Sequence, residues 1–291
     1  MRSLYVFVLL ACATLLHAQG EWPRPNWEKA ESVDCRDLAS NASTPIQKSI
    51  GEYKVRLIPS PDSPAGVRGC RADLIAPNGK STTLLKDAAV SIHQGTGEDI
   101  FSDGHPSLIL EGFSGGAHCC YTYRIVDLSN PPLILPPIEN ASPFYFFKDK
   151  ASGQFRIMTT DGAFDYFDGL CHACAVTPRV VLSVDRNGVH DASPRFVEQY
   201  DTEIAETRAR IPPGDISKFQ MSDFNDAKPV VLEIVYCYLY SGRAGDAWKT
   251  LNEMWPVGDR DRIKVLIEKT RAQGILSEIK KTRPTQTVPR K

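Results

Sequence analysis

The sequence predicts an α+β protein that is mainly β, with antiparallel blade-like or sandwich sheets followed by a C-terminal helical hairpin. Two observations lead to this prediction. Between about residues 51 and 190 apolar residues recur with a period of two, and turn-forming residues separate the runs, as in short strands. After Asp191 the apolar period lengthens to that of amphipathic helices.

The first 20 residues have the three parts of a secretory signal peptide. Arg2 precedes an uncharged apolar run from Leu4 to Leu16, and small residues follow that run. A membrane-spanning helix needs about 18 apolar residues, so we expect no transmembrane segment. The pattern predicts a secreted or periplasmic protein. Leu9 to Cys12 resembles a lipobox, so a lipoprotein acylated at Cys12 is the alternative.

Residues 21–50 are expected to form an irregular lead, because Pro23 and Pro25 interrupt it. The β domain is expected to cover residues 51–190. No helical pattern separates neighbouring strands there, which favours antiparallel connections and leaves open whether the sheets form a propeller or a sandwich. The expected strands lie at residues 53–58, 68–76, 81–85, 89–93, 107–113, 118–128, 144–148, 155–160, 164–167 and 179–185.

The helical region is expected to cover residues 191–283. Ser193 and Pro194 are an N-cap and a first-turn proline, and they predict the start of the first helix. Further helices are expected at residues 229–240 and 244–255 and from residue 259. After a glycine turn at Gly274, the apolar residues Ile275, Leu276 and Ile279 continue the helical pattern. Residues 284–291 are basic and are expected to be a disordered tail.

Composition excludes some classes of function. The chain is 42% hydrophobic and 24% charged, which is typical of globular proteins. Its formal net charge is −1, so bulk electrostatics provide no reason to expect nucleic-acid binding.

The cysteines are expected to be covalent cross-links, because exported proteins fold in oxidising compartments. Removal of the leader leaves an odd number of cysteines. We favour a vicinal Cys119–Cys120 disulfide, a local Cys171–Cys174 disulfide and a Cys35–Cys70 disulfide, although other connectivities stay open. Cys237 lies in a nearly all-apolar segment and is expected to be the free, buried thiol.

Two alternatives would make the protein an enzyme. His118 with Cys119, Cys120, Cys171 and Cys174 offers zinc ligands, but adjacent cysteines on a strand point to opposite faces.

Ser114 lies in a G-x-S-x-G pattern, which in hydrolases forms a nucleophile elbow followed by a helix. Here strand-like residues follow Ser114, so a hairpin turn at Gly115 and Gly116 explains the pattern better. We therefore expect no catalytic residues and no metal or other cofactor.

Two segments, Glu98–Leu110 and Phe113–Cys120, resemble uncharacterised secreted bacterial proteins with degenerate FG-GAP or VCBS-type repeats, the blades of integrin-like propellers, and a GGAHCC segment. The resemblance implies an exported β-rich protein without an assigned activity. Such repeats carry a calcium loop, of which only Asp99 and Asp103 remain here, too few oxygen ligands for calcium. Together with His118, Cys171 and Cys174, they are the weak metal candidates.

The sequence therefore predicts an exported, non-catalytic β-rich module for binding or for structure. Its expected partner is a protein or a glycan of unknown identity, with no nucleic acid. The alternative is a zinc-dependent or serine hydrolase that uses His118 and the cysteines, or Ser114. The oligomeric state does not follow from the sequence.

Overall fold

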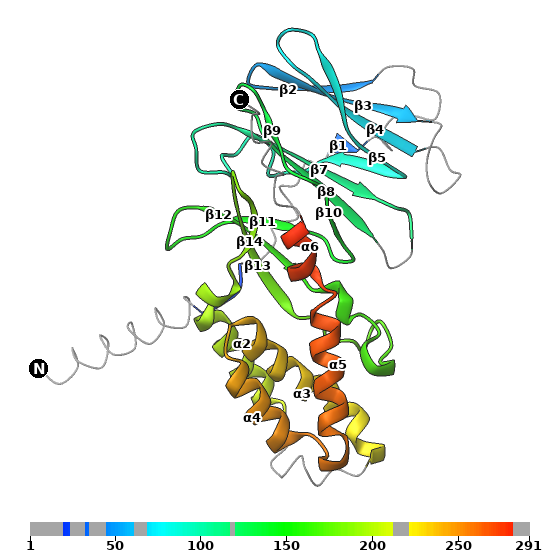
Figure 1. Ribbon diagram of the computed structural model, residues 1–291, viewed down its shortest axis with the longest axis vertical. Coiled ribbons are helices and arrows are strands. Elements are labelled where there is room, and N and C mark those ends of the chain that lie inside the picture. The colour runs from blue at the N-terminus through cyan, green and yellow to red at the C-terminus, as the bar shows by residue number, and fades with distance from the viewer. Residues whose placement is uncertain are drawn as a thin grey trace, which may run out of the picture. The chain divides into compact units, whose positions relative to one another are not determined.

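The computed structural model describes residues 20–23, 33–34, 45–60, 69–116, 120–211 and 221–281. These residues form three antiparallel sheets and a set of helices that follows them, as Figure 1 shows. The predicted α+β, mainly β fold class is confirmed.

The first sheet is a meander of four strands in the order β2-β3-β4-β5. Val55 and Leu57 of β3 are fully buried and alternate with more exposed residues, and Ala72 and Leu74 of β4 are buried on the same face. The sheet therefore has one face on the core. Its strands are β2 (Ile46–Ile50), β3 (Tyr53–Ser60), β4 (Gly69–Ile75) and β5 (Ser81–Asp87).

The second sheet has the order β1-β6-β7-β8-β10, and β9 pairs with β8. Residues of β6, β7 and β8 belong to the same hydrophobic cluster as those of the first sheet, so these two sheets share a core in the manner of a β-sandwich. The strands are β1 (Val33–Asp34), β6 (Ala89–Ile92), β7 (Ser107–Phe113), β8 (Tyr121–Asp127), β9 (Leu133–Ile134) and β10 (Ile138–Asn140).

The third sheet and the helices complete the chain. The sheet has the order β11-β12-β13-β14, with β11 (Tyr145–Lys148), β12 (Phe155–Thr160), β13 (Arg179–Asp185) and β14 (Gly188–Asp191). The helices are α2 (Val197–Ala209), α3 (Met221–Tyr240), α4 (Ala244–Met254), α5 (Arg260–Arg271) and α6 (Ile275–Lys281). Among the described residues, no helix combines the length and the apolarity needed to cross a membrane.

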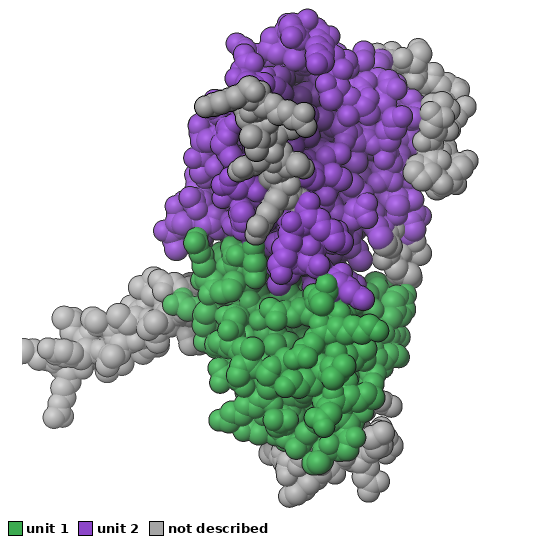
Figure 2. Space-filling view, in the orientation of Figure 1, with its two compact units in different colours: residues 1–25, 163–181, 191–272 green, residues 26–162, 182–190, 273–291 purple. Residues whose placement is uncertain are grey.

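The chain folds into two compact units, which are coloured separately in Figure 2. The helical unit comprises residues 1–25, 163–181 and 191–272, and the β unit comprises residues 26–162, 182–190 and 273–291. The units are interleaved along the chain, whereas the sequence analysis places one boundary at residue 190. Helix α6 accordingly belongs to the β unit.

Three predicted elements are corrected by the structure. Residues 164–167 are not a strand but belong to two 3₁₀ turns, at Gly162–Phe164 and Phe167–Gly169. Residues 46–50 of the expected irregular lead form β2, whose exposed middle lacks the alternation that marks a half-buried strand. Helix α3 begins at Met221 rather than at Pro229, since a proline removes only one backbone donor and buried residues follow it.

The aromatic lead residue Trp22 is anchored within the helical unit. Its indole Nε1 donates a hydrogen bond to Glu203 Oε2 at 2.6 Å, and its ring meets Tyr200 edge to face with centroids 4.9 Å apart. Burial raises the pKa of Glu203, while Arg179 and the indole partly offset this effect. The residues directly after the predicted leader therefore pack onto α2.

Gly274 is required at the start of α6. A Cβ at this position would overlap the carboxylate of Asp161, which is fully buried and accepts a hydrogen bond from Ile275 N at 3.3 Å. We expect Gly274→Ala to lower the free energy of unfolding by about 2 kcal/mol, measured by urea denaturation. Gly245→Ala is the control, because open space surrounds that helical glycine. Equal stability of the two variants would contradict the prediction.

Candidate functional site

The described cysteines are cross-linked except for one. Cys171 and Cys174 form a disulfide, so their sulfurs are not available as zinc ligands. Cys70 and Cys120 are also disulfide-bonded, and their expected partners Cys35 and Cys119 lie outside the described residues, as do Cys12 and His118. Cys237 is free and buried, and burial raises the pKa of its thiol. A buried thiol with a raised pKa is a poor nucleophile.

Ser114 lies in the connection between β7 and β8. Its Oγ accepts a hydrogen bond from Cys120 N at 2.8 Å, and its own N donates to Cys120 O at 3.1 Å. Gly115 has a φ of +85°, which suits a glycine in a turn. The next described element is the paired strand β8, so Ser114 extends a hairpin ladder instead of starting a helix.

The two calcium candidates do not act together. Asp99 accepts hydrogen bonds from Asp103 N at 3.0 Å and from Gly104 N at 2.9 Å, and it thereby closes its own loop. The carboxylate of Asp103 instead lies 3.2 Å from His105 Nδ1. Asp103, His105 and Asp127 place their ligand atoms within 4.8 Å of one another. This grouping joins residues far apart in sequence, and the sequence analysis missed two of its members.

Arg186 neutralises this cluster. Its Nη1 lies 2.9 Å from the carboxylates of both Asp103 and Asp127, and the Asp127 side chain is fully buried. Burial alone would raise the pKa of Asp103, but hydrogen bonds from His105 and Arg186 lower it. The guanidinium thus takes the position that a cation would need, and a metal ion would have to compete with it. The cluster connects the turn before β14 to the end of β8.

A different group of residues has the features of a recognition site: the loop Asp165–Cys174 in the helical unit, called the disulfide loop below. Tyr166 has a φ of 56° and Asp168 a φ of 48°. Left-handed backbone costs a residue with a Cβ about 1 kcal/mol, and it persists only where the surroundings impose it. Such strain often marks functional positions.

Buried aromatic rings hold the base of the disulfide loop. Phe164 and Phe167 are buried, and their rings lie 4.5 Å and 6.1 Å from the ring of Tyr236 on α3. Tyr166 lies between them in sequence and is 51% exposed, which makes it one of three exposed large hydrophobic side chains among the described residues. The backbone therefore turns two rings inward and presents the third to solvent.

Charged groups hold the middle of the loop. Lys228 Nζ donates to the backbone oxygen of Asp168 at 2.8 Å and contacts its carboxylate. Arg262 donates to both carboxylate oxygens, at 2.7 Å and 3.1 Å, and also pairs with Asp259. The hydrogen bonds from Arg262 lower the pKa of Asp168 by more than burial raises it, and the contact with Lys228 lowers it further. These contacts impose the left-handed conformation of Asp168.

A histidine–aspartate pair joins the beginning and the end of the disulfide loop. His172 Nδ1 lies 2.9 Å and 2.8 Å from the two carboxylate oxygens of Asp165, and the His172 side chain is half exposed. The rings of Tyr166 and His172 lie 5.7 Å apart. The disulfide closes the turn, in which Cys174 N donates to Cys171 O at 2.9 Å. The loop thus presents an aromatic ring and an oriented imidazole from a fixed backbone.

The double variant Cys171→Ser/Cys174→Ser measures what the disulfide contributes. The closed loop is short, so we expect the free energy of unfolding to fall by about 2 kcal/mol, measured by thermal denaturation. A variant as stable as the oxidised wild type would contradict the prediction.

The spacing of Cys171 and Cys174 predicts the disulfide of this loop, whereas no local pattern indicates the roles of Tyr166, His172 and Asp168. No family model, no curated protein and no solved structure matches the chain, so the resemblance to FG-GAP or VCBS-type repeats stays a prediction.

Proposed function

We propose that the protein is an exported, non-catalytic binding module and that its disulfide loop recognises a protein partner. One observation carries the proposal: Tyr166 is exposed in a left-handed conformation that an aromatic base, an ion-pair network and a disulfide together impose. Tyrosine is enriched at the energetic centres of protein interfaces. A side chain that is already ordered loses less conformational entropy on binding.

The cross-links and the leader support the exported location. Cys70, Cys120, Cys171 and Cys174 are disulfide-bonded, and structural disulfides persist mainly in oxidising compartments. Among the described residues of the alternative hydrolase, Cys171 and Cys174 are bonded to each other, Cys120 is also disulfide-bonded, and Ser114 lies in a hairpin, so these residues offer little chemistry in this arrangement.

Site-specific photocrosslinking in the cells that produce the protein tests the proposal. A photoreactive phenylalanine analogue is placed at Tyr166 or, as control, at Val265, which is 64% exposed on α5 of the same unit. We expect one discrete protein adduct from position 166 and none from position 265. Tyr166→Ala should weaken binding of that partner about thirty-fold. Identical adducts from both positions, or a lack of any adduct, would overturn the proposal.

A further inference from the structure

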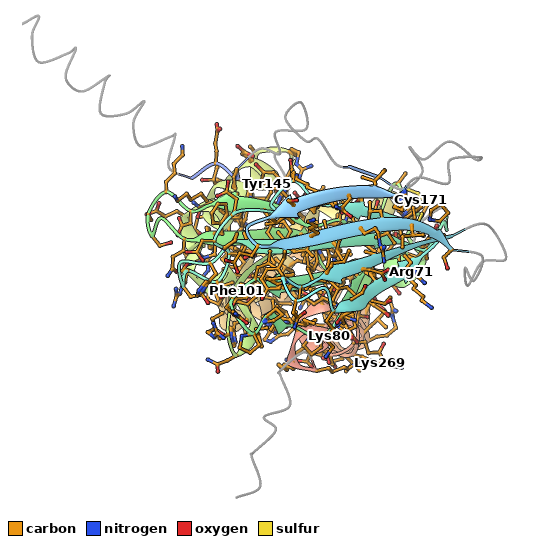
Figure 3. The ribbon with its side chains drawn as sticks, turned by 90° about the horizontal axis from the view of Figure 1, so that it is seen from above. Arg71, Lys80, Phe101, Tyr145, Cys171 and Lys269 are labelled. Atoms are coloured by element: carbon orange, nitrogen blue, oxygen red, sulfur yellow. A yellow bond between two sulfur atoms is a disulfide. The ribbon has the colours of Figure 1, made fainter. Side chains whose placement is uncertain are left out.

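The outward face of the β2–β5 sheet is strongly cationic. Alternation places Val55, Leu57, Ala72 and Leu74 on the core face, so the residues between them lie on the opposite face. Pairing across the strands sets Arg71 opposite Lys86 and Arg56 opposite Asp73. We call this surface the cationic face and define it by Lys54, Arg56, Arg71 and Lys86. Arg71 is labelled on this sheet in Figure 3.

Asp73 is the one acidic residue of these four strands whose side chain is on the cationic face, and this side chain is buried. Asp73 is 3% exposed and accepts a hydrogen bond from Thr83 Oγ1 at 2.8 Å. The other acid of the strands, Asp87, pairs with Cys70 and is therefore on the core side. The cationic face thus carries four cationic side chains and one buried carboxylate.

The arginines of the cationic face are only loosely engaged by Asp73. Arg56 Nη2 lies 3.4 Å and Arg71 Nε 3.2 Å from the carboxylate, and both side chains remain about one third exposed. Both Nε atoms are buried, and neither makes a well-aligned hydrogen bond within the described residues, so an external anion would have to be bound by the terminal Nη groups. A guanidinium has five N–H donors, and each arginine therefore keeps Nη donors beyond its contact with Asp73.

The arrangement also costs stability. Arg71 and Lys86 carry like charges at directly opposite positions of neighbouring strands, a pairing that destabilises a sheet. A local violation of this kind is expected where function requires it. An anion bound across the two strands would remove the repulsion.

The cationic face fits an anionic polymer better than a membrane or a single-stranded nucleic acid. The exposed large hydrophobic residues of the described chain are Tyr166, Val257 and Val265, and none lies on this sheet, so apolar insertion into lipid has no basis here. The four strands place no aromatic ring on this face, whereas binding of single strands relies on stacking. Guanidinium groups bind carboxylate and sulfate in two-pronged geometry.

We propose that the cationic face binds a polyanionic glycan, a polysaccharide that bears sulfate or carboxylate groups. Neighbouring strands lie about 4.8 Å apart, and alternate residues of one strand lie about 6.7 Å apart. The four cations are therefore close enough together to contact one extended polysaccharide chain. This site lies in the β unit and is independent of the disulfide loop.

Titration of the full chain with dextran sulfate at low salt tests the proposal, with uncharged dextran as the control polymer. Lys54→Gln/Lys86→Gln changes two exposed side chains and should weaken dextran sulfate binding about tenfold and flatten its salt dependence. Lys54→Arg/Lys86→Arg should bind as the wild type does. The matched control Lys150→Gln/Lys269→Gln removes the same charge from exposed positions elsewhere and should change affinity less than about twofold.

Three results would overturn the proposal. These are equal losses in the two glutamine variants, no binding of dextran sulfate by the wild type, or tighter binding to single-stranded DNA or to anionic vesicles than to dextran sulfate. Tyr166→Ala should leave this affinity unchanged, so failure of the loop proposal and failure of this one are distinguishable.

Discussion

Asp168→Ala is expected to lower the free energy of unfolding by about 3 kcal/mol. The substitution leaves the Lys228 ammonium, whose side chain is 12% exposed, without its carboxylate, and it places alanine at a φ of 48°. Arg262 keeps Asp259 as a partner, which limits the loss. Urea denaturation of the full chain measures the effect.

Two variants separate the causes. Asp168→Asn tolerates left-handed backbone but removes the charge, so about half of the loss should remain. Asp261→Ala removes an exposed carboxylate from α5 and should change stability by less than about 0.5 kcal/mol. If Asp168→Ala and Asp261→Ala unfold at the same urea concentration, the ion-pair network does not stabilise the loop.

The same carboxylate predicts an acid dependence. Hydrogen bonds from Arg262 and Lys228 lower the pKa of folded Asp168 below its unfolded value. Its contribution is therefore complete above about pH 4 and is lost as the pH falls through the lower folded pKa. In Asp168→Asn this part of the acid denaturation curve should be absent.

His93 is expected to cause the second large effect, at milder pH. Burial lowers its pKa from 6.5 to about 4, partly offset by a backbone hydrogen bond with Phe144. Its Nδ1 accepts a hydrogen bond from Gly95 N at 3.2 Å, and its ring lies 4.9 Å from that of Phe146. The folded protein thus holds the neutral imidazole.

Protonation of His93 favours the unfolded chain. Its contribution to stability is complete above pH 6.5 and decreases as the pH falls, by about 2 kcal/mol at pH 5 and about 3 kcal/mol near pH 4. His93→Gln should flatten a plot of unfolding free energy against pH between 8 and 5. A wild-type slope in His93→Gln would refute this assignment.

Strands with one buried face were predictable because burial imposes alternation on the sequence. The buried residues of β3 follow this rule, and β3 and β4 both lie where the sequence predicts strands. Residues 164–167 also alternate, with Phe164 and Tyr166 two apart, and the same rule therefore suggests a strand wrongly. Contacts of Asp168 with Lys228 and Arg262 determine the backbone there, and local patterns do not report such distant partners.

The candidate sites show the same limit. Cys171 and Cys174 are close in sequence, so their pairing was accessible to spacing arguments. The contact of Arg186 with Asp127 joins residues 59 apart, and the cationic face depends on the register of separate strands. Neither leaves a signature within one segment of the chain.

The interleaving of the two units has a consequence for inheritance and for engineering. The polypeptide passes from one unit to the other after residues 25, 162, 181, 190 and 272. No single stop codon or recombination point yields either unit whole, because a chain ending at residue 190 would lack α6 from the β unit and α2 to α5 from the helical unit. We therefore expect recombination to retain the two units together, because neither can be exchanged as one continuous segment.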